Sequence, residues 1–399
     1  MARLLLLSNG HGEDLSGALL GQALKAQGHD VEALPLVGRG NPYSEATIPV
    51  VGRTREFSTG GLGYTTFHGR LTELIQGQVM YLLRRLLRLI RIAGRYDLVV
   101  VIGDVIPVMA AWLCQRPVAT YLVAYSSHYE GRLRLPWPCG SCLRSQRFKA
   151  VFSRDALTAT DLSAQLKREV VFVGNPFMDS LLSPSNRLPY AKRRLGLLPG
   201  SRRPELEHNL LLLLGVIDQI PISHSPEGLE IDLALVGALG DDHLNQLAQS
   251  HGWSLVLGHG TAPARLEKGG WQIQVRRKGF TSVLLSSDLL LCMAGTAAEQ
   301  AVGMAKPVLQ LPGQGPQFTA GFAEAQRRLL GPTVFCATAP REGEELLKAT
   351  AKLAIELLER SVNDPDLRRH CREHAMQRLG PQGGGRKMAG LISGLLQKS

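Results

Sequence analysis

The feature that most constrains this 399-residue sequence is a recurring unit, in which a short apolar run ends in a glycine loop and continues as a helix. In the first unit, residues 4–8 are a short apolar run of four leucines that ends at a serine, residues 9–12 contain two glycines, and leucines then recur at helical spacing. Strand-like and helix-like segments alternate along most of the chain. Such alternation predicts α/β domains built on parallel sheets whose strands are buried on both faces.

Further strands are predicted from β-branched or leucine-rich runs without polar alternation. They lie at residues 31–36, 98–102, 118–123, 151–152 and 170–173, and, beyond a proline-containing linker at 184–190, at residues 195–198, 233–236, 254–257, 273–275, 289–292 and 307–311. The chain is too long for one ordinary domain. We therefore expect two Rossmann-like domains facing a cleft, formed by residues 1–183 and 191–365. Residues 366–399 are expected to form a helical tail that packs back on the first domain.

Charge and hydropathy limit the partners of the protein. The net charge of +11 attracts phosphate-bearing molecules or anionic membrane surfaces. No run approaches the roughly 20 apolar residues of a membrane span, and the start is too short for a signal peptide. We expect a cytoplasmic protein that contacts the inner membrane only peripherally. Nucleic acid is not expected, because aromatic residues are few and do not interleave with basic ones.

The segment 70–95 carries six arginines and one acid beside leucines at helical spacing. This pattern predicts a cationic amphipathic helix that lies on an anionic membrane. The arginines assigned to the membrane are Arg84, Arg85, Arg88 and Arg91. An ordinary domain helix with solvated arginines is the alternative.

The first glycine loop, residues 9–14, places His11, Gly12, Glu13 and Asp14 where a strand becomes a helix. Small residues let the backbone approach a ligand there. The two acids would repel a phosphate, which favours a sugar hydroxyl or a reacting proton as the bound group. They also complement the helix dipole, so capping alone is an alternative.

Two further loops have the character of phosphate sites. After the strand at 195–198, Ser201 offers a hydroxyl and Arg202 offers a fork of donors. After the strand at 289–292, Gly295, Thr296 and Ala297 open a helix whose free N–H groups can receive a pyrophosphate. Glu299, Gln300 and Gln317 are candidates to contact ribose, base or sugar. No metal site or cofactor is expected, since the Cys139–Cys142 pair has no second pair at zinc spacing.

Four motifs in this order resemble the lipid-A-disaccharide synthase family, and most closely its "lipid-A-disaccharide synthase-related" branch. They are Gly-Glu-Asp-Leu-Ser-Gly-Ala at 12–18, Gly-Asn-Pro-Phe-Met-Asp at 174–179, Leu-Pro-Gly-Ser-Arg at 198–202, and Gly-Thr-Ala at 295–297 with Lys-Pro at 306–307. The resemblance covers most of the chain. It implies the GT-B fold and a hexosyltransferase that moves a sugar from a UDP-linked donor to a lipid-linked acceptor, with inversion and without a metal.

By this resemblance, Ser201 and Arg202 bind the donor diphosphate, residues 295–297 cradle it, and Glu299 or Gln300 lies near the ribose. The sequence departs from the family where Gln300 replaces a glutamate and Asn175 replaces a histidine. It also keeps only one acid, Asp104, of an acidic stretch.

Inverting transfer needs a base for the acceptor hydroxyl. Asp104, directly after the strand at 98–102, is the first candidate, and Asp14 and His11 follow. A helix cap is the alternative role for Asp104. Two other functions stay open, namely epimerisation of a UDP-sugar and non-catalytic binding of lipid or nucleotide. A homodimer is compatible with the sequence.

Overall fold

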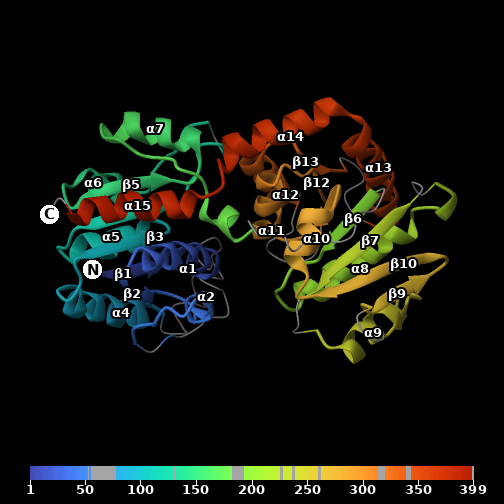
Figure 1. The fold of residues 1–399 in the computed structure, drawn as a ribbon, viewed down its shortest axis with the longest axis horizontal. Coiled ribbons are helices and arrows are strands. Elements are labelled where there is room, and N and C mark those ends of the chain that lie inside the picture. The colour runs from blue at the N-terminus through green and yellow to red at the C-terminus, as the bar shows by residue number, and fades with distance from the viewer. Residues whose placement is uncertain are drawn as a thin grey trace. The chain divides into compact units, whose positions relative to one another are not determined.

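A computed structural model describes residues 1–52, 54, 78–129, 131–181, 193–224, 228–235, 239–258, 262–312, 320–337 and 343–397 (Figure 1). The chain divides into two compact units. The first unit comprises Met1–Leu182 and Gly380–Ser399, and the second comprises Ser183–Leu379. Each unit is an α/β domain around its own sheet.

The first unit contains a five-stranded sheet in the order β2-β1-β3-β4-β5, with all pairs parallel. Its strands are β1 (Arg3–Ser8), β2 (Asp30–Pro35), β3 (Leu98–Ile102), β4 (Val118–Leu122) and β5 (Phe148–Ser153). These match the predicted runs, except that the strand expected at 170–173 is reduced to one bridge between Phe152 and Val171.

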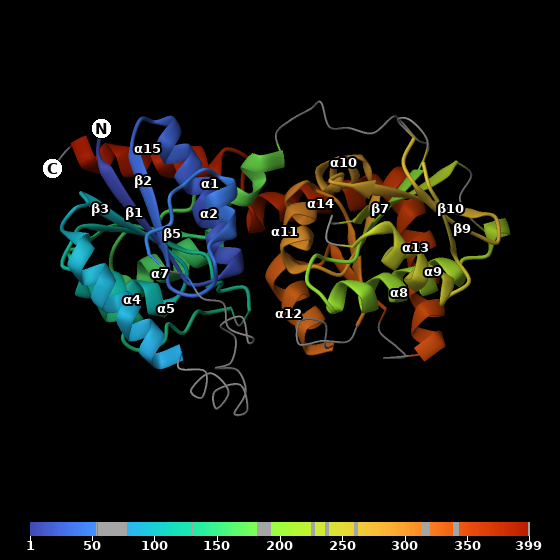
Figure 2. The ribbon, with the colours of Figure 1, turned by 90° about the horizontal axis from the view of Figure 1, so that it is seen from below.

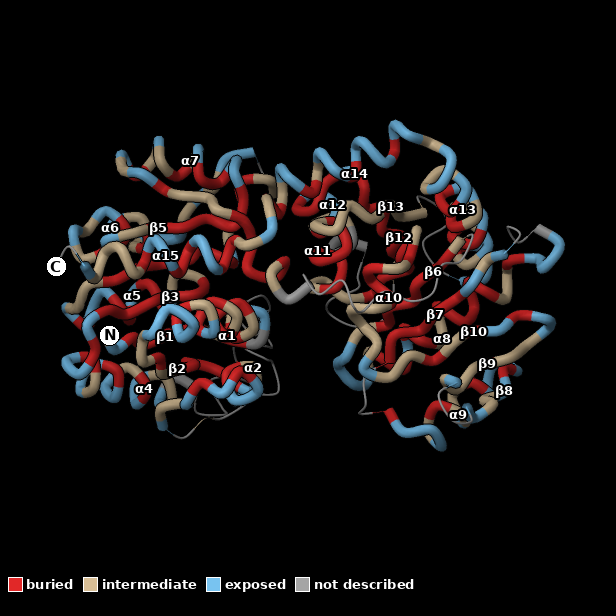
Figure 3. The backbone as a smooth tube through the Cα atoms, in the orientation of Figure 1, coloured by how far each residue is buried: buried red, intermediate tan, exposed pale blue. Residues whose placement is uncertain are grey.

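Alternation along β1 divides the core of the first unit between two helical layers. Leu5 and Leu7 face a cluster that includes residues of α4 (Gln78–Ala93), α5 (Val105–Leu113), α6 (Cys139–Arg144) and α7 (Ala156–Leu166). Leu4 and Leu6 face α1 (His11–Ala26), α2 (Asn41–Glu45) and α15 (Gly384–Gln397). The sheet is therefore covered on both faces, and the strands are buried along most of their length (Figures 2 and 3).

The C-terminal helix α15 belongs to the first unit, where it packs against α1 and the 3-10 helix η2 (Pro176–Leu181). The approach is close, because a Cβ added at Gly384 would overlap the carbonyl of Gly174. The preceding helix α14 (Pro365–Arg378) is part of the second unit. The boundary predicted at residue 365 is therefore displaced to residue 379.

The second unit contains an eight-stranded sheet in the order β13-β12-β11-β6-β7-β10-β9-β8. Its strands are β6 (Arg193–Leu198), β7 (Leu229–Leu235), β8 (Ser254–Val256), β9 (Arg265–Lys268), β10 (Trp271–Arg277), β11 (Leu289–Cys292), β12 (Val308–Gln310) and β13 (Val334–Cys336). Pairing is parallel except where β9 runs antiparallel to β8 and β10. The strands β9 and β13 are not among the predicted runs, because β9 is charged and β13 is very short.

Helices complete the second unit. They are α8 (Glu205–Asp218), α9 (Asp241–Gln249), α10 (Phe280–Ser286), α11 (Gly295–Gly303), α12 (Ala320–Leu330), α13 (Gly343–Asn363), α14 and the short 3-10 helix η4 (Ile222–His224). Leucine and isoleucine side chains of α8, α13 and the strands form one core. A buried ion cluster crosses β6, β7 and β10, where Asp232 pairs with Arg194 and Arg276. Within the described ranges, no helix is long and apolar enough to cross a membrane.

Candidate functional site

The strand order identifies where each sheet can bind a ligand. Open α/β sheets bind ligands outside the carboxyl ends of their strands, at the point where successive connections leave in opposite directions. This point is called the switch point of the sheet. In the first unit this point lies between β1 and β3, since the chain leads from β1 to β2 on one side and from β3 to β4 on the other. Ser8 and Ile102 are paired at this edge, so the loops that follow them are neighbours.

The acidic residues predicted from the sequence meet between these two loops. Glu13 Oε2 accepts a hydrogen bond of 2.7 Å from the backbone N–H of Asn9. The side-chain amide of Asn9 lies 3.4 Å from Asp104 Oδ2. Gly103 has a φ of 147°, and a Cβ added there would stand 2.7 Å from Glu13 Cδ. Glycine at this position lets the Glu13 carboxyl group lie against the β3 loop.

Asp14 lies deeper, in a chain of hydroxyl groups. Its side chain is 1% exposed, and Ser8 Oγ donates a hydrogen bond of 2.6 Å to its Oδ1. The Tyr43 hydroxyl in turn donates to Ser8 Oγ at 2.8 Å. Asp14 Oδ2 has no hydrogen-bond partner among the described residues. A carboxyl group in this setting holds its proton more strongly than one in water.

The pKa values of all three carboxyl groups are raised. Burial raises the pKa of Asp14 from 3.8 to about 7. Burial and then the charge of Asp104 raise the pKa of Glu13 well above its usual value. Burial also raises the pKa of Asp104, although hydrogen bonds from Ile106 N and the Asn9 amide oppose this rise. Carboxyl groups with raised pKa values are typical of acid–base sites.

Asp104 also has the structural role that the sequence left open. It is the N-cap of α5, and its Oδ1 accepts a 2.9 Å hydrogen bond from Ile106 N. The neighbouring Val105 N–H donates to the Tyr125 hydroxyl at 2.9 Å. Asp104 remains half-buried. The cap therefore fixes the position of the carboxyl group, and its predicted role as a base stays a prediction.

The remaining residues of the first glycine loop lie at the start of α1. Gly10 is the N-cap of α1 and has a φ of 142°, and Gly12 is exposed. His11 begins α1, but its side chain lies outside the described part of the structure. Asn175, which replaces the family's histidine, is buried, and its Oδ1 accepts from Phe177 N at 3.0 Å.

Several polar residues at this edge are not among those predicted from the sequence. Besides Tyr43, they include a small network after β4 and β5. Ser126 Oγ donates to Asp155 Oδ2 at 2.7 Å, and His128 Nε2 lies 3.6 Å from Asp155 Oδ1. The available signal was position, because Ser126 and His128 follow one predicted strand and Asp155 follows the next.

In the second unit the corresponding point lies between β6 and β11, where Leu198 pairs with Cys292. The two loops beyond this pair are fastened together. Asn209 of α8 donates from Nδ2 to the carbonyl of Pro199 at 2.9 Å and to that of Met293 at 3.4 Å. The loops predicted to bind phosphate are thus side by side at the switch point.

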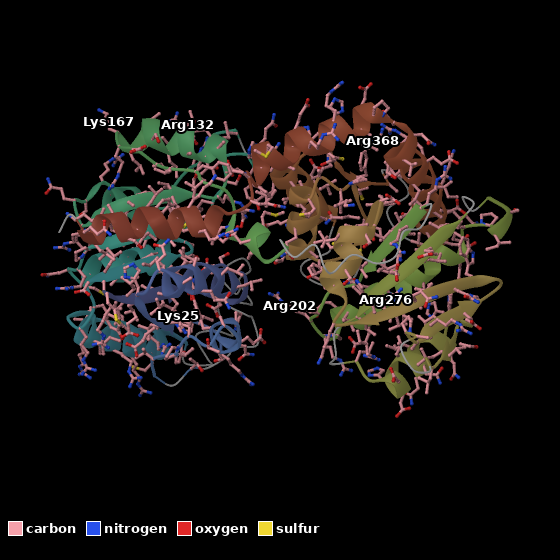
Figure 4. All side chains as sticks on the ribbon, in the orientation of Figure 1. Lys25, Arg132, Lys167, Arg202, Arg276 and Arg368 are labelled. Carbon is pink, nitrogen blue, oxygen red and sulfur yellow. The ribbon has the colours of Figure 1, made fainter. Side chains whose placement is uncertain are left out.

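Ser201 and Arg202 are exposed at this edge, and Figure 4 shows Arg202 extending away from the sheet. In the part of the chain that the structure describes, the Arg202 guanidinium has neither a hydrogen bond nor an ion pair. Its neighbour Arg203 is instead paired with Glu207 and lies 3.1 Å from His243 Nδ1. Arg202 therefore leaves its donors available to an anion.

The first turn of α11 begins at Gly295, and its N-cap residue, Ala294, makes no side-chain capping bond. Thr296 is half-buried. Ala297, Glu299 and Gln300 are buried. The contact predicted between Glu299 or Gln300 and a ribose stays a prediction. Gln317 lies outside the described residues.

The helix α4 corrects one prediction from the sequence. Arg84, Arg88 and Arg91 are exposed as expected. Arg85 is only 3% exposed, and it donates to the carbonyls of Pro35 and Val51. The assignment of Arg85 to the membrane is wrong, because its guanidinium donates hydrogen bonds to backbone carbonyls inside the first unit.

Residues 78–93 also leave four large apolar side chains in water. They recur at helical spacing, and they are Met80, Leu83, Leu87 and Ile90. Leu82, Leu86 and Leu89 of the same helix turn inward to the core. The helix is thus apolar toward both the sheet and the solvent, with arginines beside the solvent-facing stripe.

The thiols Cys139 and Cys142 are free and buried, and burial raises the pKa of Cys139 to about 12. This environment favours the protonated thiol. Across the described ranges, no group of three or more His, Cys, Asp or Glu residues is arranged to hold a metal ion.

No protein-family profile matches this sequence, and no curated protein matches it. Solved structures match over nearly the whole chain. The UDP-GlcNAc 2-epimerase from Methanocaldococcus jannaschii has 13% identity and a TM-score of 0.56, covering 98% of this chain and 99% of that one. Spinosyn rhamnosyltransferase SpnG in complex with thymidine diphosphate has 16% identity and a TM-score of 0.58, with coverage of 98% and 99%.

A third similar structure is UDP-GlcNAc 2-epimerase from Neisseria meningitidis bound to UDP-GlcNAc, with 12% identity, a TM-score of 0.54 and full coverage of both chains. Identities this low show the fold alone. The chain has the two-domain, Rossmann-like architecture of the GT-B fold, as predicted.

Proposed function

We propose that the protein is an inverting, metal-independent glycosyltransferase that moves a sugar from a UDP-linked donor to a lipid or lipid-linked acceptor. The observation that carries the proposal is the contrast between the two switch points. The second unit offers an exposed Arg202 beside the N-terminus of α11, and the first offers a cluster of carboxyl groups whose pKa values are raised. The first site suits a hydroxyl group and the second a diphosphate.

The donor side of the reaction needs groups that stabilise a departing diphosphate. The N–H groups in the first turn of α11 carry partial positive charge and lack a side-chain cap. Arg202 adds a full charge and a planar fork of donors. Structures with similar folds are named for UDP-GlcNAc or contain thymidine diphosphate, which supports a nucleotide-diphosphate sugar as the donor.

The acceptor side needs a base. Asp14 is too deeply buried to meet a substrate, whereas Asp104 and Glu13 are half-buried. Glu13 is oriented by the Asn9 N–H and by contact with the β3 loop. We therefore assign the base role to Asp104, whose negative charge raises the pKa of the neighbouring Glu13 by like-charge repulsion.

A lipid acceptor is supported by the surface of α4. Its exposed stripe of Met80, Leu83, Leu87 and Ile90 would be covered by the acyl chains of a membrane. Arg84, Arg88 and Arg91 beside it suit anionic head groups. We place the protein at the cytoplasmic face of the inner membrane. The motifs similar to lipid-A-disaccharide synthase support the same class of acceptor.

The second candidate is epimerisation of a UDP-sugar, and the epimerases among the similar folds favour it. Proton transfer on the sugar ring would use the same acid cluster and no acceptor. Mass spectrometry of the products distinguishes the two reactions. An epimerase yields an isomer of the donor, whereas a transferase yields UDP and a glycosylated lipid.

The decisive experiment measures UDP release and product mass with a panel of UDP-sugars and a membrane-lipid extract. Wild-type protein should turn over one donor, and Arg202→Ala should lose most of this activity. Asp104→Asn should lose turnover but keep UDP binding. If wild type is as inert as Arg202→Ala across the panel, the transferase proposal fails. If UDP still binds to that inert protein, a non-catalytic nucleotide-binding role replaces it.

A further inference from the structure

The first unit contains a cavity of about 460 Å³ that the proposed reaction does not use. It lies between the segment 132–138, the helix α6 and the end of α7. Its size falls within the range of small-molecule sites. Figure 4 shows one of its residues, Arg132, beside α7.

The charge of the cavity is positive. Its lining includes Arg132, Arg134 and Arg144, and none of the described lining residues is acidic. The Arg132 and Arg134 guanidiniums form no hydrogen bond or ion pair with any residue that the structure describes. Arg144 donates once, from Nη2 to the carbonyl of Gln165 at 3.2 Å. Most of the donors of three cations are therefore available to an anion.

The walls of the cavity are held in place by internal bonds. Asp161 of α7 accepts from Leu133 N at 2.7 Å and from Gln165 Nε2 at 2.8 Å. The Gln165 amide also donates to the Leu133 carbonyl at 2.9 Å. The Asp161 carboxylate thus holds the segment 132–138 against α7, and the charge of Arg132 is one of the causes that lower its pKa. Arg168 fixes the other side through the carbonyl of Leu143 at 2.7 Å.

The rim of the cavity carries Trp137, which is 89% exposed. An indole left almost wholly in water is unusual, but it is common at membrane interfaces, where a ring can be apolar on one side and wet on the other. The helix α6 follows Trp137 and packs against α5, and α5 contacts α4. Like α4, α5 exposes apolar side chains, including Met109 and Trp112.

We propose that this cavity binds the phosphate group of an anionic phospholipid, with Arg132, Arg134 and Arg144 as its cationic contacts. Trp137 inserts at the head-group level beside it. The inference rests on the membrane association in the proposed function and adds a lipid site separate from the acid cluster. Its role is to bind one head group specifically, in addition to the general attraction of the α4 arginines.

The test is flotation of the full-length protein with phosphatidylcholine vesicles, with and without phosphatidylglycerol. A triple alanine variant of Arg132, Arg134 and Arg144 should partition onto the anionic vesicles about 100-fold more weakly, because each cation near an anionic surface contributes about fivefold. A triple lysine variant at the same positions should recover most of the binding. Circular dichroism should show both variants folded, since these side chains make only one bond.

A matched control changes the same amount of charge elsewhere. Lys352, Arg372 and Lys387 are exposed on α13, α14 and α15, and their triple alanine variant should partition within about threefold of wild type. Equal losses in the two alanine variants would show attraction by net charge alone and would overturn the site. The proposed site would also be overturned if the alanine variant of Arg132, Arg134 and Arg144 partitioned onto the vesicles as strongly as wild type.

Two further arms identify the source of the phosphate. Inorganic phosphate and duplex DNA are titrated against the fluorescence of the protein, with Trp137→Phe identifying the responding indole. Tight binding of either one in solution, lost in the alanine variant and without any preference for anionic vesicles, would overturn the lipid assignment. UDP release from a soluble donor reports on the second unit, so failure of the proposed reaction would be seen independently of vesicle binding.

Discussion

Replacing Asp14 by asparagine should make the protein more stable at neutral and alkaline pH. Asp14 is 1% exposed, and its carboxyl group touches no cation directly. Asparagine has nearly the same shape, and its oxygen can still accept the hydrogen bond from Ser8. Its amide nitrogen would replace Oδ2, which has no partner among the described residues. The substitution therefore removes a buried charge without opening a cavity.

The size of this gain in stability follows from the pKa of Asp14, which burial raises from 3.8 to about 7. Between these two values the folded protein keeps a proton that the unfolded chain has lost. Stability from this proton is fully present below the lower value and is lost as the pH rises through 7. Each pH unit between these two values lowers the free energy of unfolding by about 1.4 kcal/mol, so wild type loses roughly 4 kcal/mol of stability between the lower and the upper pKa. The asparagine variant has no such loss.

The assay is urea unfolding followed by circular dichroism at about pH 5 and about pH 8. The stability of Asp14→Asn relative to wild type should rise by about 3 kcal/mol between these conditions, two pH units at about 1.4 kcal/mol each. Asp161→Asn is the matched control. Partial burial raises the pKa of Asp161, but hydrogen bonds from Leu133, Gln165 and Ser127 lower it overall. This control should lose about 1–3 kcal/mol at the higher pH. A stability of Asp14→Asn that stays below that of wild type at both pH values would refute the reasoning.

Three other substitutions test the packing around the site. Gly103→Ala should destabilise the first unit by about 1–3 kcal/mol and reduce activity, because its Cβ would meet the Glu13 carboxyl group at a positive φ; thermal melting and turnover measure both effects. Gly384→Ala should detach α15, since the new methyl group overlaps a backbone carbonyl, and amide exchange in α15 should then accelerate. Tyr43→Phe should cost about 1 kcal/mol by removing the donor to Ser8 Oγ, measured by urea unfolding, and an unchanged midpoint would show that the hydroxyl contributes nothing.

The parts of the fold that could be predicted are those that depend on residues close together in the sequence. Residues of β1 and β3 are continuous apolar runs, so their burial on both faces could be read directly. The acids Glu13 and Asp104 follow these strands, and parallel pairing of neighbouring strands was enough to bring them to one edge. The expectation failed at β9, whose sequence Arg-Leu-Glu-Lys buries only one side chain.

The polar contacts that depend on distant segments could not be predicted. Tyr43 reaches Ser8 only because α2 packs beside α1, which is a property of the folded domain. Arg85 belongs by spacing with the exposed arginines of α4. It turns inward because the carbonyls of Pro35 and Val51, which end or flank β2, need donors there. Periodicity carries no information about such partners.

The charges at the two switch points decide which of them can hold a diphosphate. A phosphate about 4 Å from a carboxylate is disfavoured by roughly 1–4 kcal/mol, and a phosphate at the same distance from Arg202 is favoured by a similar amount. Arg85, whose charge lowers the pKa of Asp14, donates its hydrogen bonds to the backbone carbonyls of Pro35 and Val51. Binding of UDP, measured by calorimetry, should therefore weaken about 10- to 100-fold in Arg202→Ala and stay unchanged in Asp104→Asn. Turnover should fall in both variants, and a UDP affinity that changes in Asp104→Asn, in either direction, would place the nucleotide at the acids instead.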